Sequence, residues 1–267
     1  MRASGRTLLL CLSLLAVPAG AESLPEPARG AQIVLLGETH DNPAHHRLQA
    51  EFTAELAPRA LVFEMLSPEQ AAALDGLADR SEPSMRAALG WDGSGWPDFA
   101  MYYPIFTAAP EAAVLGAALP RETLRAAISG GAAAAFGDGA LRYGLAADLP
   151  ATQLEDRLGL QRDAHCGALP EEMLPGMVEA QRLRDAAFAR TALDALERYG
   201  APVVVIAGRG HVRRDWGMPA ALAAAAPDVR VAAIALSEHG EEDPGDRFDV
   251  QIATEPAPRG DPCAAFR

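Results

Sequence analysis

Two short motifs constrain this chain most, because each places a glycine and then a histidine directly after a run typical of a buried strand. The first is Gly-Glu-Thr-His at residues 37–40, which follows the isoleucine-, valine- and leucine-rich run 32–36. The second is Gly-Arg-Gly-His at residues 208–211, which follows the valine-rich run 203–207. Strands covered on both faces have such continuous apolar runs, and open α/β sheets bind ligands at the carboxyl ends of their strands. The repeated Gly-x-x-His pattern therefore predicts one pocket built from both halves of the chain.

Strand-like and helix-like segments alternate along the chain. The expected strands are 33–36, 60–64, 113–116, 203–207, 231–236 and 248–253. One helix is expected to begin at Pro43 behind a cap from Asp41 or Asn42. Others are expected over 151–160 and, with an interruption near Pro175, over 171–199, whereas the alanine-rich stretch 132–135 is expected to be a loop. This alternation predicts an α/β fold with a central, mostly parallel sheet flanked by helices.

The first 21 residues have the pattern of a secretory signal peptide, with a basic start, an apolar stretch over 8–17 and a small-residue cleavage site at 19–21. Cys11 follows the bulky Leu10, which argues against lipid attachment. We therefore expect an exported protein of the periplasm or cell envelope. It would comprise one α/β domain over residues 22–267, with a proline-rich C-terminal tail.

The charge of the chain argues against nucleic-acid binding, and its cysteines suggest a disulfide or a metal site. The formal net charge is −13 and all 23 basic residues are arginine, so the chain lacks the basic footprint of a nucleic-acid-binding protein. Outside the signal peptide the cysteines are Cys166 and Cys263. A disulfide between them is favoured for an oxidising compartment, because it would anchor the tail, and a soft metal site at Cys166 beside His165 is the alternative.

The first motif is rich in groups that can carry chemistry. Glu38 and His40 are followed by His45 and His46 in the expected helix, so three of the six histidines fall within seven residues. A carboxylate and imidazoles this close suit zinc or manganese or proton transfer. The alternative is a buried hydrogen-bond network, with His45 or His46 at the surface.

Further candidates follow the second and fourth expected strands. Glu64 follows an apolar strand at the same sheet edge as Glu38, and capping of the next helix is its alternative role. His211 ends the second motif, and the glycines that flank Arg209 could form an anion-binding nest of backbone amides.

Tyr102 and Tyr103 lie in an aromatic stretch that suits core packing. A tyrosinate is also an axial ligand of haem iron in some proteins.

The sequence is similar to the ChaN-like family, a haem-binding uptake group within the Tiki/TraB superfamily. The segments that carry the resemblance are 35–43 with His45, His46 and Gln49, Val-Phe-Glu-Met at 62–65, the aromatic stretch 91–106, and segments 177–185 and 207–211. The resemblance implies an iron-linked cell-envelope protein of ChaN-like, erythromycin-esterase-like architecture. It also implies haem binding, a homodimer around the cofactor and, as a partner, outer-membrane haem or iron transport machinery.

Two functions remain as hypotheses at this point. The first is haem binding for iron uptake. Its candidate cofactor-binding residues are His40, His45, Tyr102, Tyr103, Arg209 and His211. Because lysine is absent, arginine or histidine must hold the haem propionates. The second is a metal-dependent peptidase or esterase. The wider superfamily implies that Glu38, His40, Glu64 and His211 would hold Mn, Zn or Co and carry the catalysis.

Overall fold

The strands form one sheet in which every neighbouring pair is parallel. This computed structural model describes residues 22–241, 245–261 and 263–264, and the predicted signal peptide lies outside them. The strand order is β3-β2-β4-β1-β5-β6, so the prediction of a mostly parallel sheet is confirmed. The strands are β1 (Ile33–Glu38), β2 (Ala60–Phe63), β3 (Ala113–Gly116), β4 (Val203–Gly208), β5 (Val231–Glu238) and β6 (Val250–Thr254).

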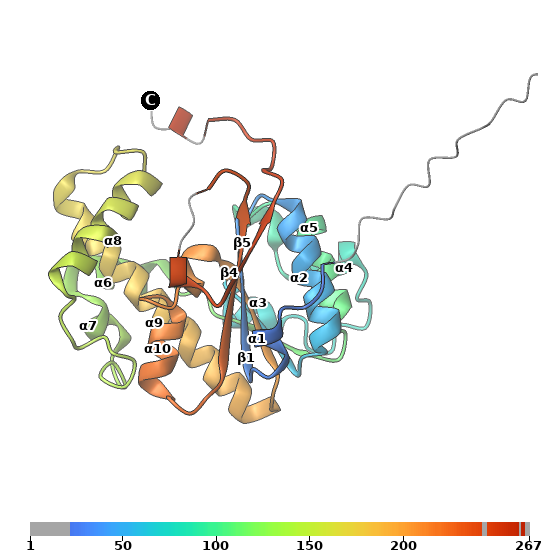
Figure 1. The fold of residues 1–267 in the computed structure, drawn as a ribbon. Helices are drawn as coiled ribbons and strands as arrows, with labels where there is room; N and C mark the ends of the chain where they lie inside the picture. Colours follow the sequence, from blue (N-terminus) through green and yellow to red (C-terminus); the bar gives the residue numbers. More distant parts are fainter. Residues whose placement is uncertain (1–21, 242–244, 262, 265–267) are drawn as a thin grey trace, which may run out of the picture.

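Helices cover both faces of the sheet. They are α1 (Glu26–Arg29), α2 (Pro43–Leu56), α3 (Pro68–Ala72), α4 (Glu82–Ala88), α5 (Phe99–Ala108), α6 (Arg121–Gly130), α7 (Ala132–Phe136), α8 (Ala151–Ala164), α9 (Leu174–Tyr199) and α10 (Met218–Ala225), with short 3₁₀ turns at Trp91–Gly93, Glu171–Met173, Arg209–Val212 and Gly245–Arg247. In Figure 1 the sheet runs through the middle, with α2, α4 and α5 on one side and α6 to α10 on the other. Among the described residues, no helix has the length and apolarity needed to cross a bilayer.

Successive side chains of a strand point to opposite faces of the sheet, so each strand contributes to the apolar core on both faces. In β1, Val34 and Leu36 pack with α2 and α5, whereas Ile33 and Leu35 pack with α9. All four side chains have no exposed surface. The doubly covered sheet thus explains the unbroken apolar runs of the sequence.

One helix differs from the expectation. Residues 132–136 form α7 rather than a loop, because Ala132 and Phe136 pack into the core beside α9. The expected interruption near Pro175 lies at residues 173–174, where the 3₁₀ turn Glu171–Met173 ends and α9 begins. This proline occupies the first turn, where no helical partner for its missing N–H is needed. The predicted cap of α2 is confirmed at Asn42, whose side chain accepts a hydrogen bond from the Ala44 amide.

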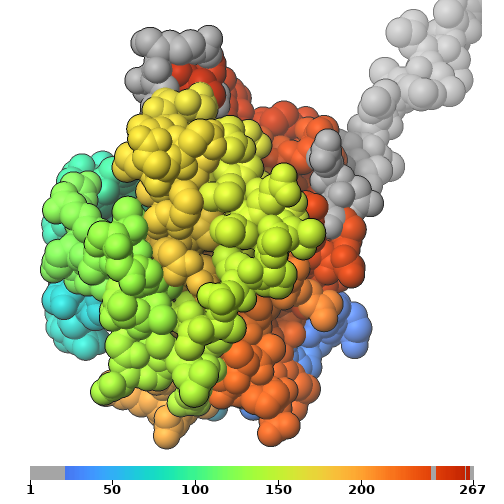
Figure 2. All heavy atoms as spheres, turned by 90° about the vertical axis from the view of Figure 1, so that its left-hand side faces the viewer, coloured from blue at the N-terminus to red at the C-terminus, as the bar shows by residue number. Residues whose placement is uncertain are grey.

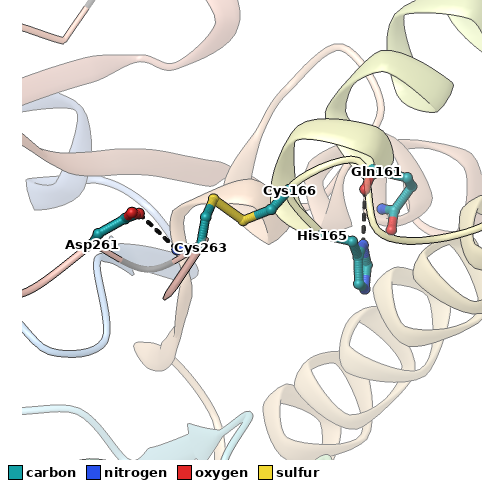
Figure 3. The surroundings of a disulfide bond; sticks show 5 residues. All are labelled: Gln161, His165, Cys166, Asp261 and Cys263. Carbon is teal, nitrogen blue, oxygen red and sulfur yellow. Dashed lines mark hydrogen bonds between the residues drawn. A yellow bond between two sulfur atoms is a disulfide. The ribbon is translucent and has the colours of Figure 1, made fainter. Parts of the chain in front are cut away.

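The C-terminal tail returns to the segment after α8. Cys166 and Cys263 form a disulfide, as the sequence predicted. Figure 3 shows this bridge next to His165, whose Nδ1 lies 2.8 Å from the Gln161 carbonyl oxygen. In Figure 2 the red tail lies beside the yellow segment that follows α8, at the top of the face that α6 to α9 cover. The disulfide therefore holds the tail against one end of α8.

Candidate functional site

The carboxyl ends of β1, β2 and β4 bring the predicted polar residues together. Glu38 is the last residue of β1 and lies opposite Gly208 in the register of β4. Glu64 directly follows β2, and its amide donates to the Ile206 carbonyl of β4. The two glutamates are almost fully buried, with 2% and 3% of their surface exposed. Buried carboxylates require compensating partners, and the neighbouring side chains provide them.

Glu38 forms the centre of the first group. Its Oε1 lies 2.8 Å from His40 Nδ1 and accepts a 2.9 Å hydrogen bond from the Tyr102 hydroxyl. His46 Nδ1 lies 3.2 Å from Oε2. Burial lowers the pKa of His40, but its contact with Glu38 and the charge of Glu64 outweigh burial and raise that pKa overall. The His40 side chain is 34% exposed, so this imidazole is the part of the group that solvent reaches.

Glu64 forms the centre of the second group. Its Oε2 accepts a 2.6 Å hydrogen bond from the Gly208 amide, and its Oε1 pairs with Arg184 and lies 3.4 Å from His211 Nε2. Gly208 also permits close approach of the first group, because a Cβ there would lie 2.9 Å from His40 Nε2. Gly208 thus lies between the two glutamate groups.

His211 is an imidazolium between two carboxylates. Its Nδ1 lies 2.6 Å from Asp185 Oδ1, on the opposite side of the ring from Glu64. Burial alone would lower the pKa of His211, but the charges of Glu64 and Asp185 raise it to about 9. Burial alone would likewise raise the pKa of Glu64, but His211 and Arg184 hold it well below its usual range. Burial raises the pKa of Asp185 overall, although the charge of His211 opposes this shift. The group therefore holds an ionised Glu64 beside a protonated His211, with Arg184 as a second cation.

The structure does not support a divalent metal on Glu38, His40, Glu64 and His211. No group of three or more histidine, cysteine, aspartate or glutamate side chains in the described part of the chain has an arrangement that could hold a metal ion. Two of the four predicted ligands are already engaged. Glu64 is committed to Gly208 and Arg184, and a protonated His211 has no free lone pair for a metal.

Three of the predicted haem contacts have partners within the chain. His45 is fully buried, and its two ring nitrogens contact the Thr39 amide and the Ser237 carbonyl at 2.9 and 3.1 Å. Tyr102 is also fully buried, and burial together with the charge of Glu38 raises the pKa of its hydroxyl, which opposes a tyrosinate. The Tyr103 hydroxyl donates to the Arg80 carbonyl at 3.2 Å.

A cavity of about 690 Å³ lies beside the charged groups, within the range of roughly 300–1,000 Å³ typical of small-molecule sites. Its walls come from α8, α9, the turn after β4 and the segments around the ends of β5 and β6. They comprise Arg157, Leu160, Gln161, Ala164, Val178, Gln181, Arg209, Gly210, Arg213, Trp216, Gly240, Glu241, Arg247, Phe248 and Gln251. The cavity thus combines apolar and aromatic surface with four arginines.

Gln181 connects this cavity to the charged groups. It lines the cavity, and its side-chain amide lies 3.1 Å from His211 Nδ1. Arg209, which the second motif singled out, also lines the cavity and pairs with Glu241. In the second motif, the Gly208 amide donates to an internal anion, Glu64.

Sequence reasoning missed the contribution of α9. Gln181, Arg184, Asp185 and Phe188 follow a spacing of three and four residues and therefore share one face of this helix. The ring of Phe188 packs edge-on against His211, with centroids 4.8 Å apart. The sequence feature that could have revealed them is the placement of Gln181, Arg184 and Asp185 between alanines and leucines of a long helix.

Comparison with known proteins agrees with the fold. The structure of ChaN from Campylobacter jejuni, described as showing cofacial haem binding, aligns with a TM-score of 0.61 and 21% identity over 81% of this chain and 84% of that one. Two looser alignments have TM-scores of 0.44. The type III effector HopBA1 is 16% identical over 84% of this chain and 88% of its own, and a mutant of the erythromycin esterase EreC in its open conformation is 14% identical over 83% and 75%. No curated protein matches the sequence significantly.

A sequence-family match covers most of the chain. The family is described as haem-binding uptake, Tiki superfamily, ChaN, and its model matches residues 24–222. This range includes both Gly-x-x-His motifs, the buried glutamates, α8 and α9. The chain therefore belongs to the ChaN family of haem-binding uptake proteins.

Proposed function

We propose that this protein binds haem in the cavity beside His211 and serves haem uptake in the cell envelope. Membership of a haem-binding family is the observation that carries the proposal. The chemistry of the cavity supports it, because haem joins a flat apolar ring to two carboxylates. Leu160, Val178 and Phe248 offer apolar surface, and the guanidinium groups offer charge to the propionates.

The envelope location rests on two features. Residues 1–21 have the pattern of a signal peptide, and Cys166 and Cys263 form a disulfide, which persists in oxidising compartments such as the periplasm. In that location the protein would exchange haem with outer-membrane haem or iron transport machinery.

We also propose that haem binding involves a second copy of the chain. The relative from Campylobacter jejuni is described by its cofacial haem binding, an arrangement in which two haem faces meet. Leu160 lies on the cavity wall of this chain and is 46% exposed, so apolar surface continues from the cavity to the outside. A mass measurement in solution with and without haemin tests this part, and the proposal predicts dimers in the presence of haemin.

A haemin titration of the mature chain tests the haem-binding proposal. We expect a saturable Soret band, and we expect Leu160→Glu to weaken binding at least about tenfold because it places a carboxylate against the apolar ring. Leu141→Glu is the matched control, because Leu141 is 81% exposed and is not part of the cavity wall. The absence of a saturable band with the unaltered protein would overturn the proposal.

A further inference from the structure

The C-terminal tail connects two walls of the 690 Å³ cavity. One wall is α8, which lines the cavity as far as Ala164, and the facing wall includes the segment after β5, from Gly240 onward. Cys166 lies two residues beyond Ala164 and is bridged to Cys263 of the tail, as Figure 3 shows. The tail is therefore bound covalently to the α8 wall.

Ion pairs and a backbone hydrogen bond hold the tail to the facing wall. Arg259 pairs with Glu238, the last residue of β5, at 2.6 Å and with Asp41 at 2.7 Å. The Ala257 amide also donates to Glu238 Oε1 at 3.0 Å. Glu238 lies two residues before Gly240, so this anchor is next to the cavity. Residues 255–261 and the disulfide thus form a clasp between the two walls.

The helix that the clasp holds is weak by itself. Arg157 is the buried residue among the 14 of α8, and no side chain caps its first turn. Gly159 lies in its interior, and no atom lies within 4 Å of the position that a Cβ would take there. Isolated helices of about 12–15 residues are marginal in water, and an interior glycine weakens them further. The position of α8 therefore depends on its attachments.

The non-covalent attachments of α8 are few. Its main packing partner is α9. The Arg157 guanidinium lies 5.1 Å from the centroid of the Trp216 ring, and the Gln153 side chain donates to the Asp215 carbonyl at 3.3 Å. Segments with few buried apolar contacts open locally at a lower free energy than the rest of a fold. Without the bridge, α8 is thus the part of the cavity wall that opens first.

The bridge is within reach of a reductant. Cys166 and Cys263 are half-buried, and their neighbours Gly167 and Ala264 are exposed, so a thiolate can approach either sulfur. Cys166 has a φ of 55° at a position after the helix where glycine is usual. A side chain is kept there at a conformational cost, which indicates that this cysteine serves the bridge.

We propose that reduction of the Cys166–Cys263 bridge by a dithiol releases α8 and opens the cavity. One thiolate of the dithiol attacks a bridge sulfur, which forms a mixed disulfide and releases the other cysteine as a thiolate. The second thiol then displaces the remaining cysteine. The bridge gains two electrons and two protons and becomes two thiols, while the dithiol is oxidised to a disulfide. As a control of ligand release this inference rests on the proposed function, but the opening itself needs no ligand.

Amide hydrogen exchange of the ligand-free mature protein, with and without dithiothreitol, tests the inference. Thiol titration confirms the state of the bridge. We expect reduction to speed exchange in α8 at least about tenfold. This exchange should depend little on low urea concentrations, because a local opening exposes little surface. Exchange in α9 should instead rise steeply with urea, since it requires global unfolding, which a lost crosslink also favours.

Strengthening α8 should oppose its release. Gly159→Ala is expected to slow exchange in α8 of the reduced protein about fourfold, because alanine favours the helix over glycine by a corresponding factor. Gly130→Ala is the matched control. Gly130 ends α6 and has no atom within 4 Å of its Cβ position either, so this change should leave exchange in α8 unaltered.

Weakening the other anchor should mimic reduction. Arg259→Gln keeps the bridge but removes the ion pairs with Asp41 and Glu238, and is expected to speed exchange in α8 of the oxidised protein at least about threefold. Arg47→Gln is the matched control, because Arg47 pairs with Glu51 on the surface of α2.

The outcomes separate the clasp from the proposed function. A bridge that stays oxidised in dithiothreitol while the protein is folded would overturn the inference. Unchanged exchange in α8 after confirmed reduction would do the same, as would equal rises in α8 and α9 with the same urea dependence, because the bridge would then stabilise the whole fold alike. Failure of the protein to bind haemin would overturn the proposed function and leave these exchange results in force.

Discussion

Replacing Glu64 by glutamine is expected to lower the free energy of unfolding by about 3–5 kcal/mol. Glu64 is buried and accepts from the Gly208 amide while it faces Arg184 and His211. Glutamine keeps the shape but removes the charge. Its NH₂ group would also face a donor, either the Gly208 amide or the two cations. The substitution therefore leaves buried positive charge uncompensated and a buried donor without an acceptor.

Urea-induced unfolding measures this effect, and Glu51→Gln is the matched control. Glu51 pairs with Arg47 one turn away on the surface of α2, and such exposed pairs contribute about 0.2–1 kcal/mol. A loss of less than about 1 kcal/mol for Glu64→Gln would contradict the description of Glu64 as the buried counter-charge of the site.

Stability is also expected to fall by about 3 kcal/mol as the pH rises from 6.5 to beyond 9. The pKa of His211 is about 9 in the folded protein and near 6.5 for an unperturbed imidazole, and each pKa unit corresponds to about 1.4 kcal/mol. Because the folded value is the higher one, the stabilisation is complete below pH 6.5 and is lost as the pH passes through 9. The stability that Glu64 contributes depends on pH in the opposite direction. Its depressed pKa stabilises the fold above its ordinary value near 4.3 and ceases to do so in acid.

The groups that face His211 account for this dependence. They are Glu64 and Asp185, which favour the charged ring, and Arg184, which opposes it. Urea unfolding at pH 6.5 and 9.5 measures the change. His211→Gln should flatten the dependence, whereas His165→Gln, outside this network, should retain it. An equal pH dependence in unaltered and His211→Gln proteins would show that other groups are responsible.

The sheet edge could be predicted because local sequence determines it. The apolar runs before Glu38, Glu64 and Gly208 fix three strands, and parallel strands present their carboxyl ends at the same edge. Each predicted strand is present, and both of its ends lie within two residues of the expected ones. The juxtaposition of Glu38, Glu64 and His211 follows from this regularity alone.

The partners of those residues could not be predicted in the same way. Asp185 and Arg184 reach the site from α9, about 120 residues after Glu64, and only the packing of that helix determines which strand end they meet. Tyr102 illustrates the converse. The sequence left both core packing and a haem-ligand role open for it, and tertiary packing buries the side chain with its hydroxyl on Glu38. The cavity was also beyond prediction, because α8 and residues 240–251 have weak periodicity.

The most direct test of the account is a crystal structure of the mature protein with bound haemin. The account predicts a haem ring between α8 and the ends of β5 and β6, against Trp216 and Phe248, with its propionates on the arginine-lined wall. A ring bound instead beside Tyr103, or one whose propionates avoid the arginine-lined wall, would contradict the assignment of this cavity as the haem site.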